Sequence, residues 1–291
     1  MRNGIILLDK PKGLSSNGAL QRVRKAYRAA SAGHVGTLDP MATGMLPLCL
    51  NEATKVIAEI ESGAKCYEFT VRLGSRMDTG DAEGSVVEEQ PIPALEGGLV
   101  EHTLARFRGV QTQVPPMYSA LKRDGRPLYE LARQGIEVER AARTIDVRQL
   151  ELVGLRPDAL DLACECAKGT YIRVLGEDIA RALGTLGHLT ALRRSWVEPF
   201  RDMPMLSLEA VLEGAEDASG LLPADAALQH LPYVGIGPEQ AIALRHGQAV
   251  QSATQAPPGA RVRVYAPSGD FMGLAEVTPE GWLQPRRLMA P

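Results

Sequence analysis

An aspartate within a glycine-rich stretch is the first candidate for a reactive group. Asp39 lies in GHVGTLDPMATG, residues 33–44, which we predict to be a shaped loop without regular structure because it holds three glycines and Pro40. Pro40 keeps the preceding residue away from helical geometry. A carboxylate held in a fixed loop can act as a nucleophile, a general base or a metal ligand. The alternative is a structural aspartate whose side chain caps the turn that follows.

The second candidate is a cation in the first turn of a predicted helix, where it requires an anionic partner. We predict a helix that has Thr170 as its N-cap and ends near Gly184. Arg173 would then oppose the helix dipole, and a nearby carboxylate or phosphate would compensate for this. A fully hydrated Arg173 on the surface is the alternative.

Three further side chains have types that suit a binding pocket. Tyr67 lies on the apolar face of a predicted strand, Tyr171 stands at the start of the helix of Arg173, and His34 lies in the loop of Asp39. Core packing would explain the two tyrosines equally well, and a turn position would explain the histidine. Residue type alone leaves both interpretations open.

Several motifs of cofactor and metal chemistry are missing from the sequence. It contains no G-x-x-x-x-G-K-[ST] phosphate loop, no G-x-G-x-x-G dinucleotide fingerprint and no G-x-S-x-G nucleophile elbow. The four cysteines form no C-x-x-C pair, and the five histidines show no H-x-x-x-H or H-E-x-x-H spacing. We therefore expect chemistry by ordinary side chains, with no cofactor, no metal and no disulfide framework.

Hydropathy argues against a membrane partner. No run of about 18 apolar residues occurs in the sequence, and the apolar run before Asp9 is too short for a secretory signal. We expect a cytoplasmic protein that acts as a monomer.

The distribution of charge predicts a basic face on a nearly neutral molecule. The net charge is -3, yet residues 10–28 hold six basic side chains and no acid, and residues 106–148 hold nine basic side chains against five acids. The acids gather in residues 74–101 and 201–231. Such segregation suits a polyanion such as a nucleic acid, although solvated helix faces would give the same pattern.

Hydrophobic periodicity predicts an α/β (α+β) fold. A boundary near residues 215–232 divides the chain into a catalytic domain of residues 1–231, from which a segment of about 106–148 projects, and a small β-rich domain of residues 232–291. The expected elements are strands at 4–8, 67–73, 160–167, 261–265 and 271–277, and helices from Ser15 or Ser16 to about Ala30, over 99–109, from Thr170 to about Gly184 and over 238–246.

Residues 33–55, GHVGTLDPMATGMLPLCLNEATK, strongly resemble the signature of the TruB family of bacterial tRNA pseudouridine-55 synthases. The resemblance covers most of residues 4–200, and the C-terminal 60 residues resemble the family's PUA-like RNA-binding domain less closely. Residues 35–37, VGT, depart from the TGA of many members without affecting Asp39. The further matching motifs are, in order, LLDKP at 7–11, RLG at 72–74, DT at 78–79, PMYSALK at 116–122, KGTYIR at 168–173 and LRR at 192–194.

The resemblance implies the pseudouridine synthase fold, in which a mixed central sheet surrounds a cleft, and a cofactor-independent reaction. A uridine at position 55 in the T loop of tRNA would be flipped out of the stack and isomerised to pseudouridine. Asp39 is implied as the nucleophile, with attack on either the ribose C1′ or the base C6.

The resemblance also implies roles for further side chains. The implied substrate contacts are Tyr67 stacked on the flipped uracil, Arg173 paired with Asp39, Tyr171 and Leu192 lining the pocket, and His34 filling space left by displaced T-loop bases. The basic side chains expected at RNA phosphates are Lys10, Lys12, Arg22, Lys25, Lys122 and Arg193.

Two other functions fit much of the same sequence. A guide-RNA-dependent pseudouridylase shares the catalytic core, but the compact length and the lack of Lys-rich tails favour the stand-alone type. A non-catalytic tRNA-folding chaperone would need the basic face but not Asp39. The joint presence of Asp39, Tyr67 and Arg173 favours catalysis over binding alone.

Overall fold

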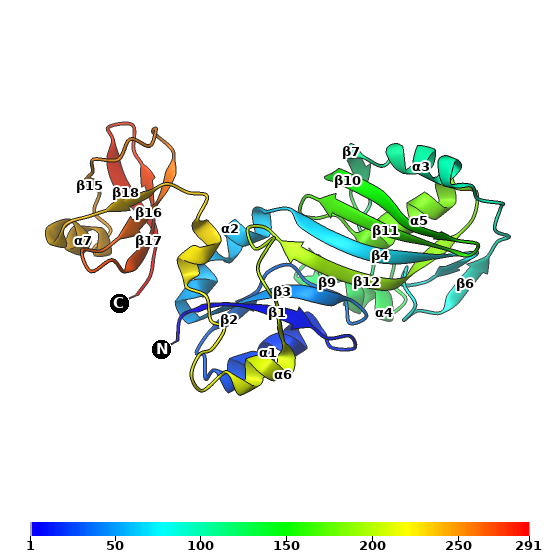
Figure 1. Ribbon diagram of the computed structural model, residues 1–291, viewed down its shortest axis with the longest axis horizontal. Helices are drawn as coiled ribbons and strands as arrows, with labels where there is room; N and C mark the ends of the chain where they lie inside the picture. The colour runs from blue at the N-terminus through cyan, green and yellow to red at the C-terminus, as the bar shows by residue number, and fades with distance from the viewer. Residues whose placement is uncertain (1, 291) are drawn as a thin grey trace.

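A mixed sheet is the scaffold of the computed structural model, which describes residues 2–290 (Figure 1). Within that range the sheet has nine strands; β12 runs parallel to β3, whereas β4 runs antiparallel to both β12 and β11. The strand order is β13 (Leu206–Ser207), β1 (Gly4–Lys10), β3 (Thr43–Leu50), β12 (Gly187–Val197), β4 (Lys65–Leu73), β11 (Ala159–Cys166), β10 (Arg143–Arg156) and β7 (Gly109–Gln113), with β2 (Ala32–His34) paired to β3.

Strand β4 shows how the alternating pattern produces the sheet. Its buried face carries Lys65 and then apolar or aromatic side chains at every second position from Tyr67 to Leu73. Glu68 and Arg72 on the other face are exposed. Because successive side chains of a strand point to opposite faces, this period of two buries one face only. The strand expected at 67–73 is present, and so is the one at 160–167.

Helices cover the sheet in two groups. Helix α5 (Ile172–Ala182) packs on β12 and β4, and α3 (Gly97–Ala105) packs on β10. Helices α1 (Ser16–Ala26) and α6 (Leu208–Glu213) lie side by side at the bottom of Figure 1, with α6 against β1 and α1 against β2 and β3. The other helical segments are η1 (Asn51–Val56), α2 (Ile57–Ser62), α4 (Leu128–Arg133), η2 (Ala224–Leu228) and α7 (Pro238–Arg245).

Helix α1 begins where the sequence predicts and ends early. The Ser15 hydroxyl caps it by accepting a hydrogen bond from the Gly18 amide at 3.0 Å. The helix stops at Ala26 rather than near Ala30, because Arg28 adopts a positive φ of 49°. Arg24 then donates to the carbonyls of Ala29 and Ala30. The prediction missed this end because no glycine or proline marks it.

The prediction of Thr170 as the N-cap of α5 is wrong. The cap is Tyr171, without a side-chain capping bond, and the Thr170 hydroxyl instead donates to the Ala167 carbonyl at 3.1 Å. Arg173 nevertheless lies in the first turn of α5. The electrostatic argument for an anionic partner therefore still applies.

The stretch 33–44 is more regular than expected. Its first residues belong to β2 and its last to β3, so only residues 35–42 form the loop. Glycine is required at position 44, where φ is +100° and a Cβ atom would lie 2.2 Å from the Arg194 carbonyl oxygen. This close approach lets β3 and β12 pair next to the loop of Asp39.

The projecting segment is narrower than residues 106–148. Strand β7 and the start of β10 belong to the large sheet, so only residues 114–142 leave it. These residues carry the short hairpin of β8 (Lys122–Arg123) and β9 (Arg126–Pro127), followed by α4. The acidic stretch around Asp78 lies between β5 (Ser75–Met77) and β6 (Val86–Glu89), which pair with each other.

A separate five-stranded sheet forms the C-terminal part, at the left of Figure 1. It packs on the main body through Phe271, Leu274 and Met289. Across the same junction Lys55 donates to the Leu288 carbonyl, and Arg261 pairs with Glu59. The strand order is β14 (Tyr233–Gly235), β16 (Arg261–Tyr265), β17 (Phe271–Val277), β18 (Trp282–Leu288) and β15 (Val250–Gln251), with α7 against β15 and β18.

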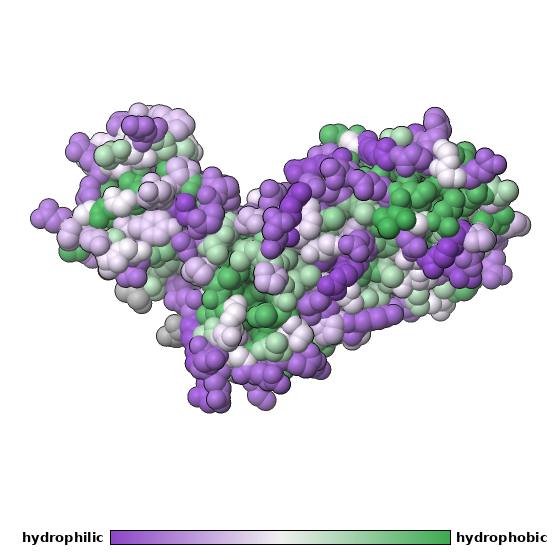
Figure 2. Space-filling model, in the orientation of Figure 1, coloured by the Kyte–Doolittle hydropathy of each residue, from purple (hydrophilic) through white to green (hydrophobic). Residues whose placement is uncertain are grey.

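The face drawn in Figure 2 is largely hydrophilic, with an apolar patch toward the right end of the large sheet. Strand β10 contributes exposed apolar side chains, among them Val153 and Leu155. Within residues 2–290, no helix is both long and apolar enough to cross a membrane.

Candidate active site

The loop of Asp39 is fixed on both sides of the aspartate. Before it, the Ser16 hydroxyl accepts from the Leu38 amide at 2.8 Å and donates to the Leu38 carbonyl at 2.9 Å. After it, the Pro40 carbonyl accepts from the Gly13 amide at 2.7 Å. Anchors on α1 and on the turn after β1 therefore hold the backbone of this loop in one conformation.

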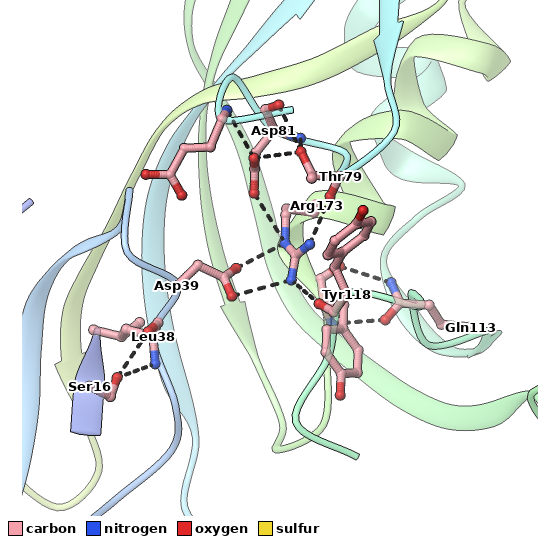
Figure 3. A network of polar contacts seen from close by, with 10 residues as sticks. Ser16, Leu38, Asp39, Thr79, Asp81, Gln113, Tyr118 and Arg173 are labelled. Carbon is pink, nitrogen blue, oxygen red and sulfur yellow. Dashed lines mark hydrogen bonds and ion pairs between the residues drawn. The ribbon is translucent and has the colours of Figure 1, made fainter. Parts of the chain in front are cut away.

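Asp39 forms a two-pronged ion pair with Arg173. The Arg173 Nε lies 2.9 Å from Asp39 Oδ2, and Nη2 donates to Oδ1 at 3.2 Å (Figure 3). The Arg173 side chain is only 6% exposed, whereas that of Asp39 is 33% exposed. A planar guanidinium that grips both carboxylate oxygens fixes the orientation as well as the charge of the acid.

Arg173 is itself held by backbone carbonyls from two other segments. It donates to Thr79 at 2.7 Å and to Tyr118 at 2.7 Å. Its Nε also lies 3.7 Å from Oδ2 of the buried Asp81, whose other carboxylate oxygen accepts from the Thr79 hydroxyl (Figure 3). The guanidinium thus joins α5, the loop after β5 and the segment after β7 around Asp39.

Burial, more than the ion pair, sets the pKa of Asp39. Removal from water raises the pKa of this carboxyl, the Arg173 guanidinium opposes the rise, and the Asp81 carboxylate adds to it. The net direction is upward. Desolvation therefore exceeds the attraction of the ion pair in its effect on this pKa.

Asp39 opens into a cavity of about 320 Å³ between its loop, β4, α5 and β12. This lies within the roughly 300–1,000 Å³ typical of small-molecule pockets. The same cavity is lined by four other side chains that the family resemblance implies as substrate contacts. They are Tyr67, Tyr171, Arg173 and Leu192.

The tyrosines of the cavity are protonated at neutral pH. Burial raises the pKa of Tyr67 to about 12, although the nearby Arg194 opposes the shift. Burial also raises the pKa of Tyr171, whose backbone amide donates to Gln113 at 2.8 Å. The two rings and the Leu192 side chain offer apolar surface on which a planar base can stack.

His34 is not among the residues that line the cavity. It ends β2, pairs with Leu48 on β3 and is half-buried, with its Nδ1 unpartnered. Burial, followed by the charge of Arg194, lowers the pKa of its imidazole. The structure therefore places His34 beside the site rather than in its wall.

Lys10 does not fit the expected role at an RNA phosphate. Its side chain is completely buried, and its ammonium donates to the carbonyls of Pro11, Leu14 and Pro40. Burial lowers its pKa to about 8. Lys10 instead joins the turn after β1 to the loop of Asp39. The prediction that it contacts an RNA phosphate is wrong, because its ammonium is buried among carbonyls.

The other basic candidates lie outside the cavity. Arg22 and Lys25 are exposed on α1, and Lys122 is exposed in the β8–β9 hairpin. Lys12 and Arg193 line a neighbouring hollow, where Arg193 pairs with Asp9 at 2.8 Å.

Three residues that the sequence analysis did not single out belong to the site. Asp81 lies next to Arg173, while Lys65 and Arg194 line the cavity. A lysine at 65, in phase with the buried face of β4, is a signal that the alternating pattern contained. Asp81 and Arg194 gave no comparable signal, because their contacts join segments far apart in the chain. Within residues 2–290, no cluster of three or more His, Cys, Asp or Glu side chains is arranged to hold a metal ion.

Comparison with known proteins gives a consistent result along the chain. A family model described as TruB family pseudouridylate synthase, N-terminal domain, matches residues 24–172. Models for the tRNA pseudouridylate synthase B C-terminal domain and for the C-terminal part of pseudouridine synthase II TruB match residues 173–229 and 232–289.

Similar proteins cover nearly the whole chain. The tRNA pseudouridine synthase B of Chromohalobacter salexigens is 48% identical over 99% of this chain and 94% of its own length. The protein of the same name from Aromatoleum aromaticum is 49% identical over 99% and 93%.

A solved structure shares the fold, and the family follows from the sequence matches. A chain in the crystal structure of a Cbf5-Nop10-Gar1 complex is 24% identical, with a TM-score of 0.74 over 99% of this chain and 85% of that one. The mixed sheet with its C-terminal β-rich part is therefore the pseudouridine synthase fold, as expected. The chain is an enzyme that belongs to the TruB family of pseudouridylate synthases.

Proposed function

We propose that this enzyme isomerises uridine to pseudouridine at position 55 in the T loop of tRNA, with Asp39 as its nucleophile. The observation that carries the proposal is the Asp39 carboxylate, gripped by Arg173 and facing a cavity lined by Tyr67, Tyr171 and Leu192. Full-length relatives named tRNA pseudouridine synthase B support tRNA as the substrate.

The reaction conserves all atoms of the substrate, which explains why ordinary side chains suffice. The C1′–N1 bond breaks and its electron pair stays on the uracil ring. The ring turns, a C5–C1′ bond forms, C5 loses its proton and N1 gains one. The uridine is neither oxidised nor reduced, and it passes no group to a second molecule. The overall change therefore requires no redox partner and no co-substrate.

Each part of the cavity has a task in this sequence of steps. Asp39, ionised and oriented by Arg173, is the nucleophile that bonds to the ribose C1′ or to the base C6, and this bond breaks again before the product leaves. Tyr67 stacks on the flipped uracil, while Leu192 and Tyr171 exclude water and limit how far the ring can move. Flipping out the base costs a few kcal/mol, which stacking within the cavity offsets.

Release of tritium from RNA labelled at uracil C5 tests the activity, because C5 exchanges its hydrogen for a carbon bond. We expect the purified protein alone to release one tritium for each T-stem-loop. A requirement for an added guide RNA would instead favour a guided pseudouridylase. Tight binding of the RNA without release would leave a tRNA-folding chaperone as the better description.

RNA binding should depend steeply on salt, because exposed cations on α1 and on the β8–β9 hairpin are proposed to contact phosphates. The logarithm of the affinity should fall by roughly 0.7–0.9 per logarithm of salt for each phosphate contact. Filter binding with the Lys122→Ala variant should give a slope shallower by about one contact. A slope near zero for the wild-type protein would contradict the basic face.

We propose that residues 232–291 form an accessory RNA-binding domain rather than part of the catalytic machinery. Truncation after Leu231 should raise the KM for tRNA more than it lowers kcat. The truncated chain exposes apolar surface that Phe271 and Leu274 cover, so circular dichroism and the melting temperature must first show that it is folded. Loss of kcat in a truncated protein that is still folded would contradict the assignment of residues 232–291 to RNA binding alone.

A further inference from the structure

Part of the cavity wall, outside the Asp39–Arg173 ion pair, carries two buried cations without a carboxylate partner. Arg194 is completely buried and Lys65 is 5% exposed, and both line the cavity. Within residues 2–290, no carboxylate lies within ion-pairing distance of either side chain, although fifteen such contacts exist elsewhere. Buried charges are normally paired, so this wall is prepared for an anion that the free protein lacks.

Backbone carbonyls hold both cations in place without neutralising them. Arg194 donates from Nε to Met45 at 2.7 Å and from Nη2 to the carbonyls of Val35 and Gly36. Lys65 donates to the carbonyls of Glu61 at 3.0 Å and Gly63 at 2.9 Å, at the C-terminal end of α2. An ammonium has three donors, so Lys65 keeps one donor free.

The charged residues at the cavity fall into two sets. In one set, Asp39 and the neighbouring Asp81 share a single cation, Arg173. The other set is Lys65 and Arg194, with Lys168 at the same cavity and only the exposed Glu61 as an acid. A group in the cavity therefore experiences a field that favours negative charge toward Lys65 on β4 and Arg194 on β12.

We propose that Lys65, supported by Arg194, is an electrostatic catalyst that stabilises the negative charge on the uracil ring while it is detached from the ribose. The inference rests on the proposed function, because it assigns the charge to an intermediate of that reaction. When the C1′–N1 bond breaks, the electron pair spreads over N1, O2 and O4. A fixed cation in a site shielded from water stabilises such a charge far more than it would in water.

The alternative is that Lys65 has a structural task only, as a cap for the carbonyls that end α2. A cap would influence stability but not the chemical step. The Lys65→Met variant keeps the length of the side chain and removes the charge, whereas Lys65→Arg keeps the charge. The pair of variants therefore separates charge from packing.

Single-turnover rates with excess enzyme form the first test. We expect Lys65→Met to slow pseudouridine formation by about 10²-fold, the scale observed for loss of one preorganised donor, with RNA affinity unchanged. Lys65→Arg should recover most of this loss. A Lys65→Met enzyme with the wild-type single-turnover rate would overturn the proposal.

The alkaline side of the pH profile forms the second test. Burial lowers the pKa of Lys65 to about 8, with Arg194 and Lys168 adding to the shift and Cys166 and Glu61 opposing it. A lysine that must be charged loses its effect as the pH rises through its pKa. The wild-type rate should therefore fall above about pH 8, and Lys65→Arg should move this fall to higher pH.

Two other groups need controls in this pH range. Cys166 is the partner of Lys65 on β11, and Lys10 has a pKa of about 8 near Asp39. A Cys166→Ala variant should retain an alkaline fall, moved to lower pH because Cys166 opposes the lowering of the pKa of Lys65. A fall that disappears in Cys166→Ala, or that persists unchanged in Lys65→Arg, would assign the titration to another group and overturn the assignment to Lys65.

Binding of a small anion gives a readout that needs no activity. Barbiturate has the ring of uracil and is anionic at neutral pH, so the free enzyme should bind it more tightly than uracil in an NMR titration. Lys65→Met should lose this preference, and Arg181→Met, which removes an exposed cation on α5, should keep it. If the wild-type enzyme failed to modify T-arm RNA, the proposed function would fall, and barbiturate selectivity would still decide for or against the anion site.

Discussion

Replacement of Asp39 by Asn is expected to abolish turnover while leaving the fold and tRNA binding intact. Asn keeps the size and the loop position of the side chain, but its amide is not a nucleophile. The rate should fall on the order of 10⁴-fold or more, the scale observed when an essential catalytic group is removed. Affinity should remain near that of the wild type, because the proposed phosphate contacts lie elsewhere on the surface.

Stability measurements complete the test of Asp39. The raised pKa of this carboxyl means that its charged form is less stable in the folded protein than in water. Removing the charge should therefore not lower the melting temperature. Asp202→Asn, an exposed aspartate outside the cavity, serves as the matched control and should retain full activity. Measurable turnover by a verified Asp39→Asn preparation would remove the nucleophile assignment.

Arg173 is expected to influence catalysis rather than affinity. Four of the five N–H donors of its guanidinium contact Asp39, Thr79 and Tyr118, so at most one donor is left for the RNA backbone. Arg173→Lys, which replaces a planar fork by a point charge, should reduce the single-turnover rate on the order of 10²-fold or more. Arg173→Ala should be worse, because it leaves Asp39 and Asp81 without their shared cation.

The dependence of the rate on pH gives a second prediction for Arg173, the direction in which the acidic limb of the profile moves. As the proposed nucleophile, Asp39 must be ionised, so the rate should fall as the pH drops through its pKa. Arg173 is the largest influence that lowers this pKa. Its removal should therefore shift the acidic limb of the profile to higher pH. An Arg173→Lys or Arg173→Ala enzyme with a normal single-turnover rate and weakened RNA binding would identify Arg173 as a phosphate ligand instead.

Local patterns predicted much of the fold. The alternation along β4 and the Ser15 cap of α1 act over a few residues, so sequence alone could reveal them. The end of α1 depends on a positive φ at Arg28, which is a costly conformation that only the folded surroundings of Arg24 and Asn51 stabilise. Such a feature leaves no trace in a local pattern.

Local patterns predicted the candidate residues of the site, whereas the pairing of Asp39 with Arg173 was implied only by the family resemblance. Asp39 and Arg173 were identified from a loop and a helix dipole, yet they meet across 134 positions of sequence. Lys10 shows the reverse error. A basic residue in a basic stretch predicts a surface cation, but here two carbonyls of the turn after β1 and one of the Asp39 loop enclose the ammonium. Burial of this kind depends on long-range packing.

Nucleotide-resolution mapping of pseudouridine tests the central claim most directly. A T-arm stem-loop is incubated with the protein, treated with carbodiimide, and read by primer extension beside a transcript that carries cytidine at position 55. We predict a single new stop at position 55 with the wild-type protein, and none with Asp39→Asn or with the cytidine transcript. A stop at another uridine, or no stop with active wild-type protein, would contradict the account.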